Sequence, residues 1–150
     1  MSGKKKNVLF VGKHTGYKRF DIAIDILAEI PELSLKIIGG GLITQAEKQI
    51  FDKNLSGRYE WLDLLPNGAL CNLYNESFCL LYTTNYEGFG VLVLEAQSCG
   101  CPVVCQPVSS IPEVAGDAGI YFNPGDMAGR IAQIKKLFDP AYYAKISLRH

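Results

Sequence analysis

Short apolar runs alternate with longer segments of helical periodicity along almost the whole chain, and this alternation constrains the fold more than any other feature. It is typical of α/β proteins in which helices connect the strands of a mainly parallel sheet. Most of the runs are continuously apolar, as strands covered on both faces must be. We therefore predict an open, mainly parallel, Rossmann-like six-stranded sheet with helices on both faces. The expected strands are 7–11, 34–38, 59–62, 78–82, 102–106 and 119–122.

The segments between these runs carry apolar residues at helical spacing. We expect helices at 19–30, 42–55, 68–75, 90–99 and 127–138. No linker rich in Pro, Gly or Ser divides the chain, so we predict a single domain at residues 7–140. A basic, flexible tail is expected at residues 1–6, and the weakly patterned residues 141–150 are expected to form a frayed or truncated end.

Composition excludes several classes of function. Fifteen Lys and Arg balance 15 Asp and Glu, so no net field attracts nucleic acid. No apolar stretch approaches the roughly 18 residues that span a bilayer, and the start does not resemble a signal peptide. The cysteines are odd in number, with neither Cys-x-x-Cys spacing nor a His cluster, so we expect reduced, mostly buried thiols in a cytoplasmic protein and no metal site. They are Cys71, Cys79, Cys99, Cys101 and Cys105.

The segment after the first strand is suited to bind a phosphate. It combines two glycines, Gly12 and Gly16, with the cations Lys13, Lys18 and Arg19 just before a helix. Backbone amides and the helix dipole favour an anion at such a turn, and lysines add positive charge. An ordinary loop with solvated lysines remains the alternative. The spacing matches neither the dinucleotide fingerprint nor the nucleoside triphosphate loop.

The segment after the fourth strand carries two carboxylates. Glu87 is followed by Gly88 and Gly90, which let a ligand approach the backbone, and Glu95 interrupts an apolar helix. We expect that helix to be buried, so Glu95 needs a partner. It would lie about 7.5 Å from the helix start, close to the length of a phosphate-to-ribose step. The alternatives are a paired core carboxylate at Glu95 and a solvated loop acid at Glu87.

Several motifs in order carry a family resemblance. The most specific is Glu87-Gly88-Phe89-Gly90 followed by Leu94-Glu95-Ala96, with supporting matches at 99–104, 112–114, 116–119 and 123–126. From Val8 to Pro140 the chain resembles the nucleotide-sugar-binding half of retaining glycosyltransferases of the GT-B fold, the "glycosyl transferases group 1" family. The resemblance implies that the domain is one half of such a fold.

The resemblance also implies that basic side chains bind the donor diphosphate. The family has an Arg after the first strand and a Lys five residues further on, and this chain has Lys13 and Lys18 there. Lys13 departs from the pattern because it lacks the bidentate guanidinium of Arg, and Arg19 stands where the family usually has Gly. Phosphate binding is therefore better supported for Lys18, which would stabilise the leaving group, than for Lys13.

The second segment would bind the rest of the donor. By resemblance, Glu87 orients the transferred sugar and serves the catalytic site. The backbone around Gly88, Phe89 and Gly90 contacts sugar or phosphate, and Glu95 holds the ribose hydroxyls.

For the whole enzyme, the resemblance implies transfer of a sugar from a UDP or GDP sugar to a hydroxyl acceptor, with retention and with no cofactor or metal. Polysaccharide, lipopolysaccharide or glycoconjugate synthesis is the implied setting. The required partner is an N-terminal acceptor-binding domain, without which this chain would be inactive. The basic run at 4–6 fits either a solvated tail or a peripheral contact at the cytoplasmic face of a membrane. An epimerase-like domain and a non-catalytic nucleotide-binding module remain alternatives.

Overall fold

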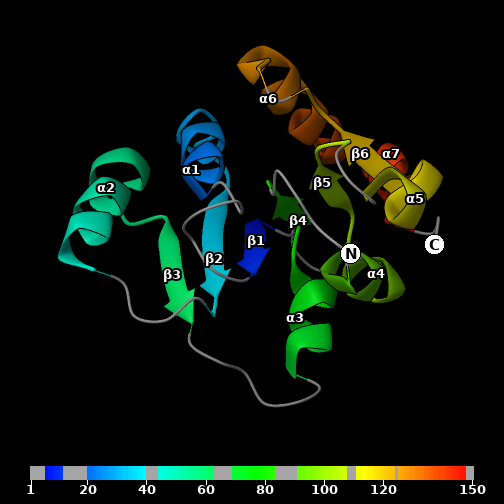
Figure 1. The fold of residues 1–150 in the computed structure, drawn as a ribbon, viewed down its shortest axis with the longest axis horizontal. Coiled ribbons are helices and arrows are strands. Elements are labelled where there is room, and N and C mark those ends of the chain that lie inside the picture. Colours follow the sequence, from blue (N-terminus) through cyan, green and yellow to red (C-terminus); the bar gives the residue numbers. More distant parts are fainter. Residues whose placement is uncertain are drawn as a thin grey trace.

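Six parallel strands form one sheet in the order β3-β2-β1-β4-β5-β6, as Figure 1 shows. The computed structural model describes residues 6–11, 20–39, 44–62, 69–83, 91–107, 111–123 and 125–147. The strands are β1 (Asn7–Val11), β2 (Ser34–Ile38), β3 (Tyr59–Leu62), β4 (Cys79–Tyr82), β5 (Val103–Cys105) and β6 (Gly119–Tyr121).

Helices cover both faces of this sheet (Figure 1). They are α1 (Phe20–Ala28), α2 (Gln45–Leu55), α3 (Ala69–Glu76), α4 (Val91–Ser98), α5 (Ile111–Ala115), α6 (Met127–Lys135) and α7 (Pro140–Ser147). Short 3-10 helices follow α5 at Gly116–Ala118 and α6 at Lys136–Phe138.

The strand side chains alternate between two apolar clusters. Val8 and Phe10 of β1 join the cluster formed with α1, α2, α6 and α7, whereas Leu9 joins the cluster formed with α3, α4 and α5. All three side chains are buried. This double burial explains why the central strands read as continuously apolar, because β1, β4 and β5 are buried on both faces.

The predicted α/β architecture is confirmed, and each observed strand lies within one residue of the predicted bounds. Two α-helices and the 3-10 helix at Gly116–Ala118 were not predicted. Helix α5 is only five residues long, too short for a periodic pattern. Helix α7 forms where a frayed end was expected, because Ile146 is buried and the Tyr143 hydroxyl donates to the Ser77 carbonyl at 3.0 Å.

Arg58 ties the end of α1 to the start of β3. Its guanidinium donates to the carbonyls of Leu27 and Ile30, each at 3.2 Å, and also to that of Leu33. Carbonyls at a helix C-terminus lack partners within the helix and carry the negative end of its dipole. A half-buried cation therefore adds a charged donor to three carbonyls at the turn between α1 and β2, where those of Leu27 and Ile30 also accept backbone N–H groups.

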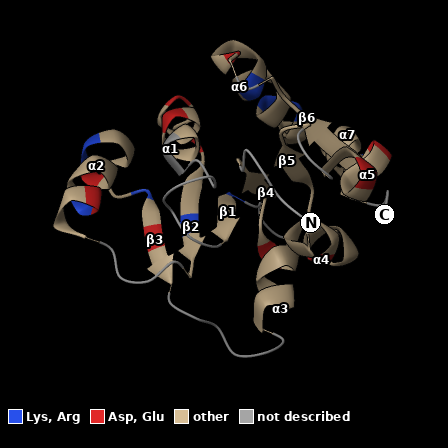
Figure 2. Cartoon of the chain, in the orientation of Figure 1, with Lys and Arg blue, Asp and Glu red and all other residues tan. Residues whose placement is uncertain are grey.

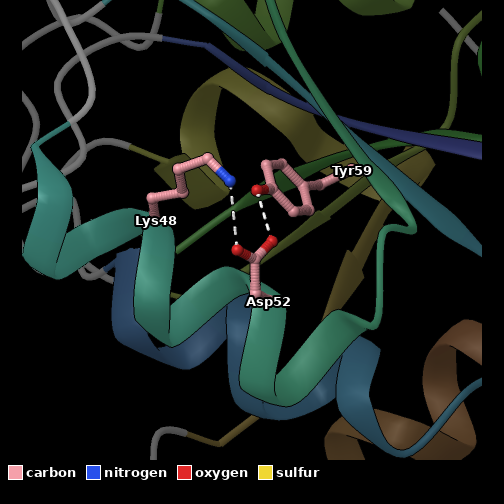
Figure 3. A network of polar contacts seen from close by, with 3 residues as sticks. All are labelled: Lys48, Asp52 and Tyr59. Carbon is pink, nitrogen blue, oxygen red and sulfur yellow. Dashed lines mark hydrogen bonds and ion pairs between the residues drawn. The ribbon is translucent and has the colours of Figure 1, made fainter.

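A polar network links α2 to the edge strand β3 (Figure 3). The Tyr59 hydroxyl donates to Asp52 at 2.7 Å, and the Lys48 ammonium donates to the same carboxylate at 3.1 Å. The hydrogen bond from Tyr59, then that from Lys48, holds the pKa of Asp52 below its ordinary value, and the bond to Asp52 raises the pKa of Tyr59. The contribution of Asp52 to folding is therefore present above its ordinary pKa and lost as the pH falls below it.

Replacing Arg58 tests the hydrogen bonds that connect the end of α1 with the start of β3. Arg58→Ala should lower the free energy of unfolding by about 1.5 to 3 kcal/mol, the usual scale for hydrogen bonds to a charged group. Urea denaturation measures the change. Lys53→Ala, which removes an exposed cation from the last turn of α2, is the matched control and should change stability by less than about 0.5 kcal/mol. Equal effects of the two substitutions would contradict the role of Arg58.

Replacing Asp52 tests the network in Figure 3. Asp52→Asn removes the main cause of the raised pKa of Tyr59, so that pKa should fall toward its ordinary value. Carbon NMR of labelled tyrosine, with the signal identified by its loss in Tyr59→Phe, follows the titration. Glu60→Gln removes a neighbouring exposed charge and should have a smaller effect. An unchanged pKa of Tyr59 in Asp52→Asn would show that the hydrogen bond does not persist in solution.

Candidate functional site

The order in which the chain adds strands to the sheet changes side between β1 and β4. Strands β2 and β3 lie on one side of β1, whereas β4, β5 and β6 lie on the other. Leu9 of β1 pairs in parallel with Leu80 of β4, so the two strands end at the same edge, at Val11 and Tyr82. In open α/β sheets, ligands bind outside the carboxyl ends of the strands at such a switch point.

The two segments singled out by sequence follow these two strand ends. Residues 12–19 and 84–90 lie outside the described residues. They include Lys13, Lys18, Glu87, Gly88, Phe89 and Gly90, so these six predicted site residues stay predictions. What the structure establishes is that the chain enters both segments from neighbouring strands.

Glu95 lies on α4 and is exposed. The expectation of a buried carboxylate is therefore wrong. Only one side of α4 contacts the sheet, through Val93 and Ala96, so its outer side meets solvent despite its apolar sequence. Leu94, next to Glu95, is 50% exposed. The apolar composition of the helix suggested burial on all sides, and the position of α4 in the outer layer overrides it.

A groove of about 320 Å³ runs between α3 and α4, and Glu95 forms part of its wall. Glu95 is the one charged residue of α4, and α3 has only Glu76 (Figure 2). The groove therefore combines an isolated carboxylate with apolar and small polar surface, an arrangement that suits a ligand with several hydroxyl groups. Its lining residues are Cys71, Tyr74, Val91, Leu94, Glu95, Ser98 and Cys99.

Tyr74 adds a second polar group to this groove. The side chain is 1% exposed, and its hydroxyl has no hydrogen-bond partner among the described residues. Burial, and secondly the carboxylate of Glu95, raises the pKa of Tyr74. A buried hydroxyl without a partner is costly, so Tyr74 is a candidate donor to a ligand in the groove.

The end of α4 is fixed by a Schellman motif. Gly100, at φ 75°, donates its N–H to the Gln97 carbonyl at 3.0 Å, and Cys101 donates to Ala96 at 2.9 Å. Glycine adopts this left-handed conformation without steric cost. The motif sets the direction in which the chain leaves α4 and enters β5.

A second, larger groove of about 640 Å³ lies on the other flank of α4, toward α5 and the 3-10 helix that follows it. Its wall includes Gln97, whose amide donates to the Ala115 carbonyl at 3.1 Å, and Asp117. None of the predicted site residues lines it. We therefore place the candidate site on the α3 side of α4.

Cys71 and Cys99 form a disulfide between α3 and the end of α4, with 6.0 Å between their Cα atoms. The expectation that all five cysteines are reduced is wrong in this structure, because α3 and α4 pack side by side and bring together residues 28 positions apart. The other three form no disulfide and are buried, as expected. Burial raises the pKa of Cys105 to about 12 and that of Cys79 well above its ordinary value.

Sequence reasoning missed the roles of Tyr74, Cys71 and Cys99. Tyr74 follows Leu70 and Leu73 at helical spacing and reads as a core residue, which its burial confirms, but nothing in the sequence reveals an unpaired hydroxyl. The cysteine pairing depends on helix packing, which residue spacing does not encode.

Within the described part of the chain, no group of three or more His, Cys, Asp or Glu side chains is placed to hold a metal ion. No described helix is long and apolar enough to cross a membrane.

The sheet order defines an α/β protein whose topological switch point lies between β1 and β4, the place where such sheets bind ligands. Residues 1–145 match the family "Glycosyl transferases group 1", and the chain belongs to this family. The O-antigen chain mannosyltransferase B of Escherichia coli is 45% identical over 78 residues, which cover 52% of this chain and 20% of that protein. The D-inositol 3-phosphate glycosyltransferase of Mycolicibacterium smegmatis is 27% identical over 156 residues, covering 97% and 36%.

Solved structures share the fold. Sucrose-phosphate synthase from Thermosynechococcus elongatus superposes with a TM-score of 0.84 at 23% identity, covering 96% of this chain and 39% of that one. Anabaena Alr3699/HepE in complex with UDP-glucose gives a TM-score of 0.81 at 21% identity, covering 95% and 42%. The chain thus spans less than half the length of these relatives and neighbours.

Replacing Tyr74 tests whether its hydroxyl is unpaired. Tyr74→Phe should raise the free energy of unfolding by about 1 kcal/mol, because it removes a buried polar group that lacks a partner. Tyr143→Phe is the matched control. It removes a hydroxyl that donates to the Ser77 carbonyl and should lower stability by about 1 kcal/mol. Thermal or urea unfolding measures both, and a loss of stability in Tyr74→Phe would contradict the assignment.

Proposed function

We propose that this chain is the donor-binding domain of a retaining glycosyltransferase, which transfers a sugar from a nucleoside diphosphate sugar to a hydroxyl acceptor. The single observation that carries the proposal is the adjacency of β1 and β4, whose ends lead into the two segments with phosphate-binding and sugar-binding patterns. Membership of the glycosyltransferase family supports the same conclusion.

In this proposal, the segment after β1 binds the diphosphate. Lys18, assisted by Lys13, neutralises the charge that develops on the leaving group as the bond to the sugar breaks. Positively charged groups that are already in position stabilise negative charge as it develops, so they stabilise the transition state more than the bound substrate. Lys18 therefore serves both donor binding and catalysis.

The segment after β4 binds the sugar. Glu87 accepts hydrogen bonds from sugar hydroxyls and orients the ring, and the backbone of Gly88, Phe89 and Gly90 approaches sugar or phosphate. We assign Glu87 this orienting role, not that of a covalent nucleophile. Retention and independence of a metal are part of the proposal.

The groove between α3 and α4 supplies the nucleoside end of the site. Glu95 lies four residues after Val91, about 6 Å along the helix axis from its first residue. A ligand whose phosphate lies near the start of α4 would thus bring its ribose to Glu95. Because Glu95 is exposed, its carboxylate can accept hydrogen bonds from the ribose hydroxyl groups. Tyr74, from the facing helix, would donate a further hydrogen bond.

The acceptor must be bound by another part of the enzyme. An open donor site neither positions an acceptor nor excludes water, so the 150-residue chain alone should lack transferase activity. Since the chain spans only part of its relatives, an N-terminal acceptor-binding domain is the proposed partner. Polysaccharide or glycoconjugate synthesis is the proposed setting, supported by the name of the E. coli relative. The cytoplasmic side of a membrane is the proposed location.

Substitution of the two glutamates tests the division of the site. Glu95→Gln should weaken binding of UDP or GDP, whichever the chain prefers, by about 5-fold to 30-fold, which corresponds to about 1 to 2 kcal/mol. The affinity for the corresponding nucleotide sugar should fall by the same factor. Glu87→Gln should leave the bare nucleotide within about 2-fold and reduce only the extra affinity gained from the sugar. Isothermal titration calorimetry with UDP, GDP, UDP-glucose and GDP-mannose gives all four comparisons.

Glu113→Gln is the matched control, because Glu113 is also an exposed helical carboxylate but lines neither groove. It should leave every affinity unchanged. Absence of nucleotide binding in the wild-type chain, or equal losses from Glu95→Gln and Glu113→Gln, would overturn the proposed function.

A further inference from the structure

The disulfide lies at the rim of the groove that contains Glu95. Cys71 and Cys99 both line the groove, one from each helix. Cys71 is exposed and Cys99 is half-buried. The remaining cysteines, Cys79, Cys101 and Cys105, are at most 1% exposed. The pair is therefore the part of the cysteine set that a small molecule can reach.

The two sulfurs differ in their surroundings. Cys71 lies in the first turn of α3, where backbone N–H groups have no partners within the helix and the positive end of the helix dipole favours a thiolate. Cys99 directly follows α4, where the dipole has the opposite sign. Since the thiolate is the nucleophile in exchange, Cys71 is the attacking sulfur and Cys99 the resolving one.

Cys99 is linked directly to the turn that carries Glu95. Its N–H donates to the Glu95 carbonyl at 3.2 Å and to the Ala96 carbonyl at 3.1 Å. A covalent bond from Cys99 to α3 therefore anchors the last turn of α4 and fixes the width of the groove on its Glu95 side. Loss of that bond leaves this turn held by the Schellman motif and by packing on the sheet.

We propose that Cys71 and Cys99 form a reversible thiol–disulfide exchange site for small-molecule disulfides, and that the oxidised state orders the α4 turn that carries Glu95. In the first step, the Cys71 thiolate attacks glutathione disulfide, breaks its S–S bond and releases one glutathione thiolate. The Cys99 thiolate then attacks Cys71 of the mixed disulfide and releases the second. The two protein thiols lose two electrons, and glutathione disulfide gains them.

The consequence for ligands rests on the proposed function. If Glu95 binds the ribose of the donor, the oxidised chain binds nucleotide more tightly because its groove is already ordered. Ordering a binding site before the ligand arrives removes part of the cost of binding. Oxidation state would then regulate donor affinity without a change in any residue that contacts the diphosphate.

The first test measures exchange itself. The chain is equilibrated in glutathione buffers of increasing oxidised fraction, alkylated and analysed by mass spectrometry. Cys71 and Cys99 should become protected together, and Cys79, Cys101 and Cys105 should react only after unfolding. Cys71→Ser should abolish the disulfide, whereas Cys105→Ala should leave it intact. Failure of Cys71 and Cys99 to become protected together, or equal alkylation of all five cysteines in the folded chain, would overturn the proposal.

The second test measures the turn without any ligand. Hydrogen exchange at the amides of Cys99, Gly100 and Cys101 should be at least 3-fold slower in the oxidised chain than in the reduced one. In Cys71→Ser, the hydrogen-exchange rates of these amides should be the same in oxidising and in reducing buffer. Equal rates in oxidised and reduced wild-type chain would overturn the coupling between the disulfide and α4.

The third test measures nucleotide affinity in both states. UDP and GDP should bind at least 3-fold more weakly to the reduced wild-type chain, and Cys71→Ser should show no dependence on redox buffer. Binding that is equal in both states would overturn the regulatory consequence but not the donor site. Absence of binding in both states would overturn the proposed function, and the first two tests would still decide whether the exchange site exists.

Discussion

Hydrogen bonding of β1 on both edges, to β2 and to β4, is the constraint on which the rest of the structure depends. It places the first strand in the centre of the sheet. The next two strands, β2 and β3, lie on one side of it, and β4, β5 and β6 lie on the other. A central strand has no face toward water, which explains the buried side chains of Val8, Leu9 and Phe10. The same arrangement brings the ends of β1 and β4 together, at the kind of switch point where open α/β sheets bind ligands.

Much of the fold could be predicted because strands buried on both faces leave a strong signal. The runs at β1 and β4 are apolar or nearly so, and their bounds agree with the structure to within one residue. Helix α7 could not be predicted, because its order comes from long-range contacts such as that between Tyr143 and Ser77. Local sequence carries no trace of a contact between residues 66 positions apart.

The candidate site was predictable in position but not in detail. Its position follows from the strands that precede the glycine-rich segments, whereas the exposure of Glu95 depends on which side of α4 meets the sheet. That choice is made by Val93 and Ala96, which pack inward. The apolar Leu94 on the opposite side made the helix look buried all round. Tyr74 and the Cys71–Cys99 pair enter the site only because α3 packs beside α4.

Mapping a bound donor by NMR tests the central claim most directly. A nucleoside diphosphate sugar is titrated into the labelled chain, and the amide signals that shift are assigned. The account predicts shifts at the ends of β1 and β4, including Val11 and Thr83, and along the Glu95 side of α4. Shifts confined to the other flank of α4, around Val114 and Asp117, would contradict it, because that groove includes neither Glu95 nor a strand end.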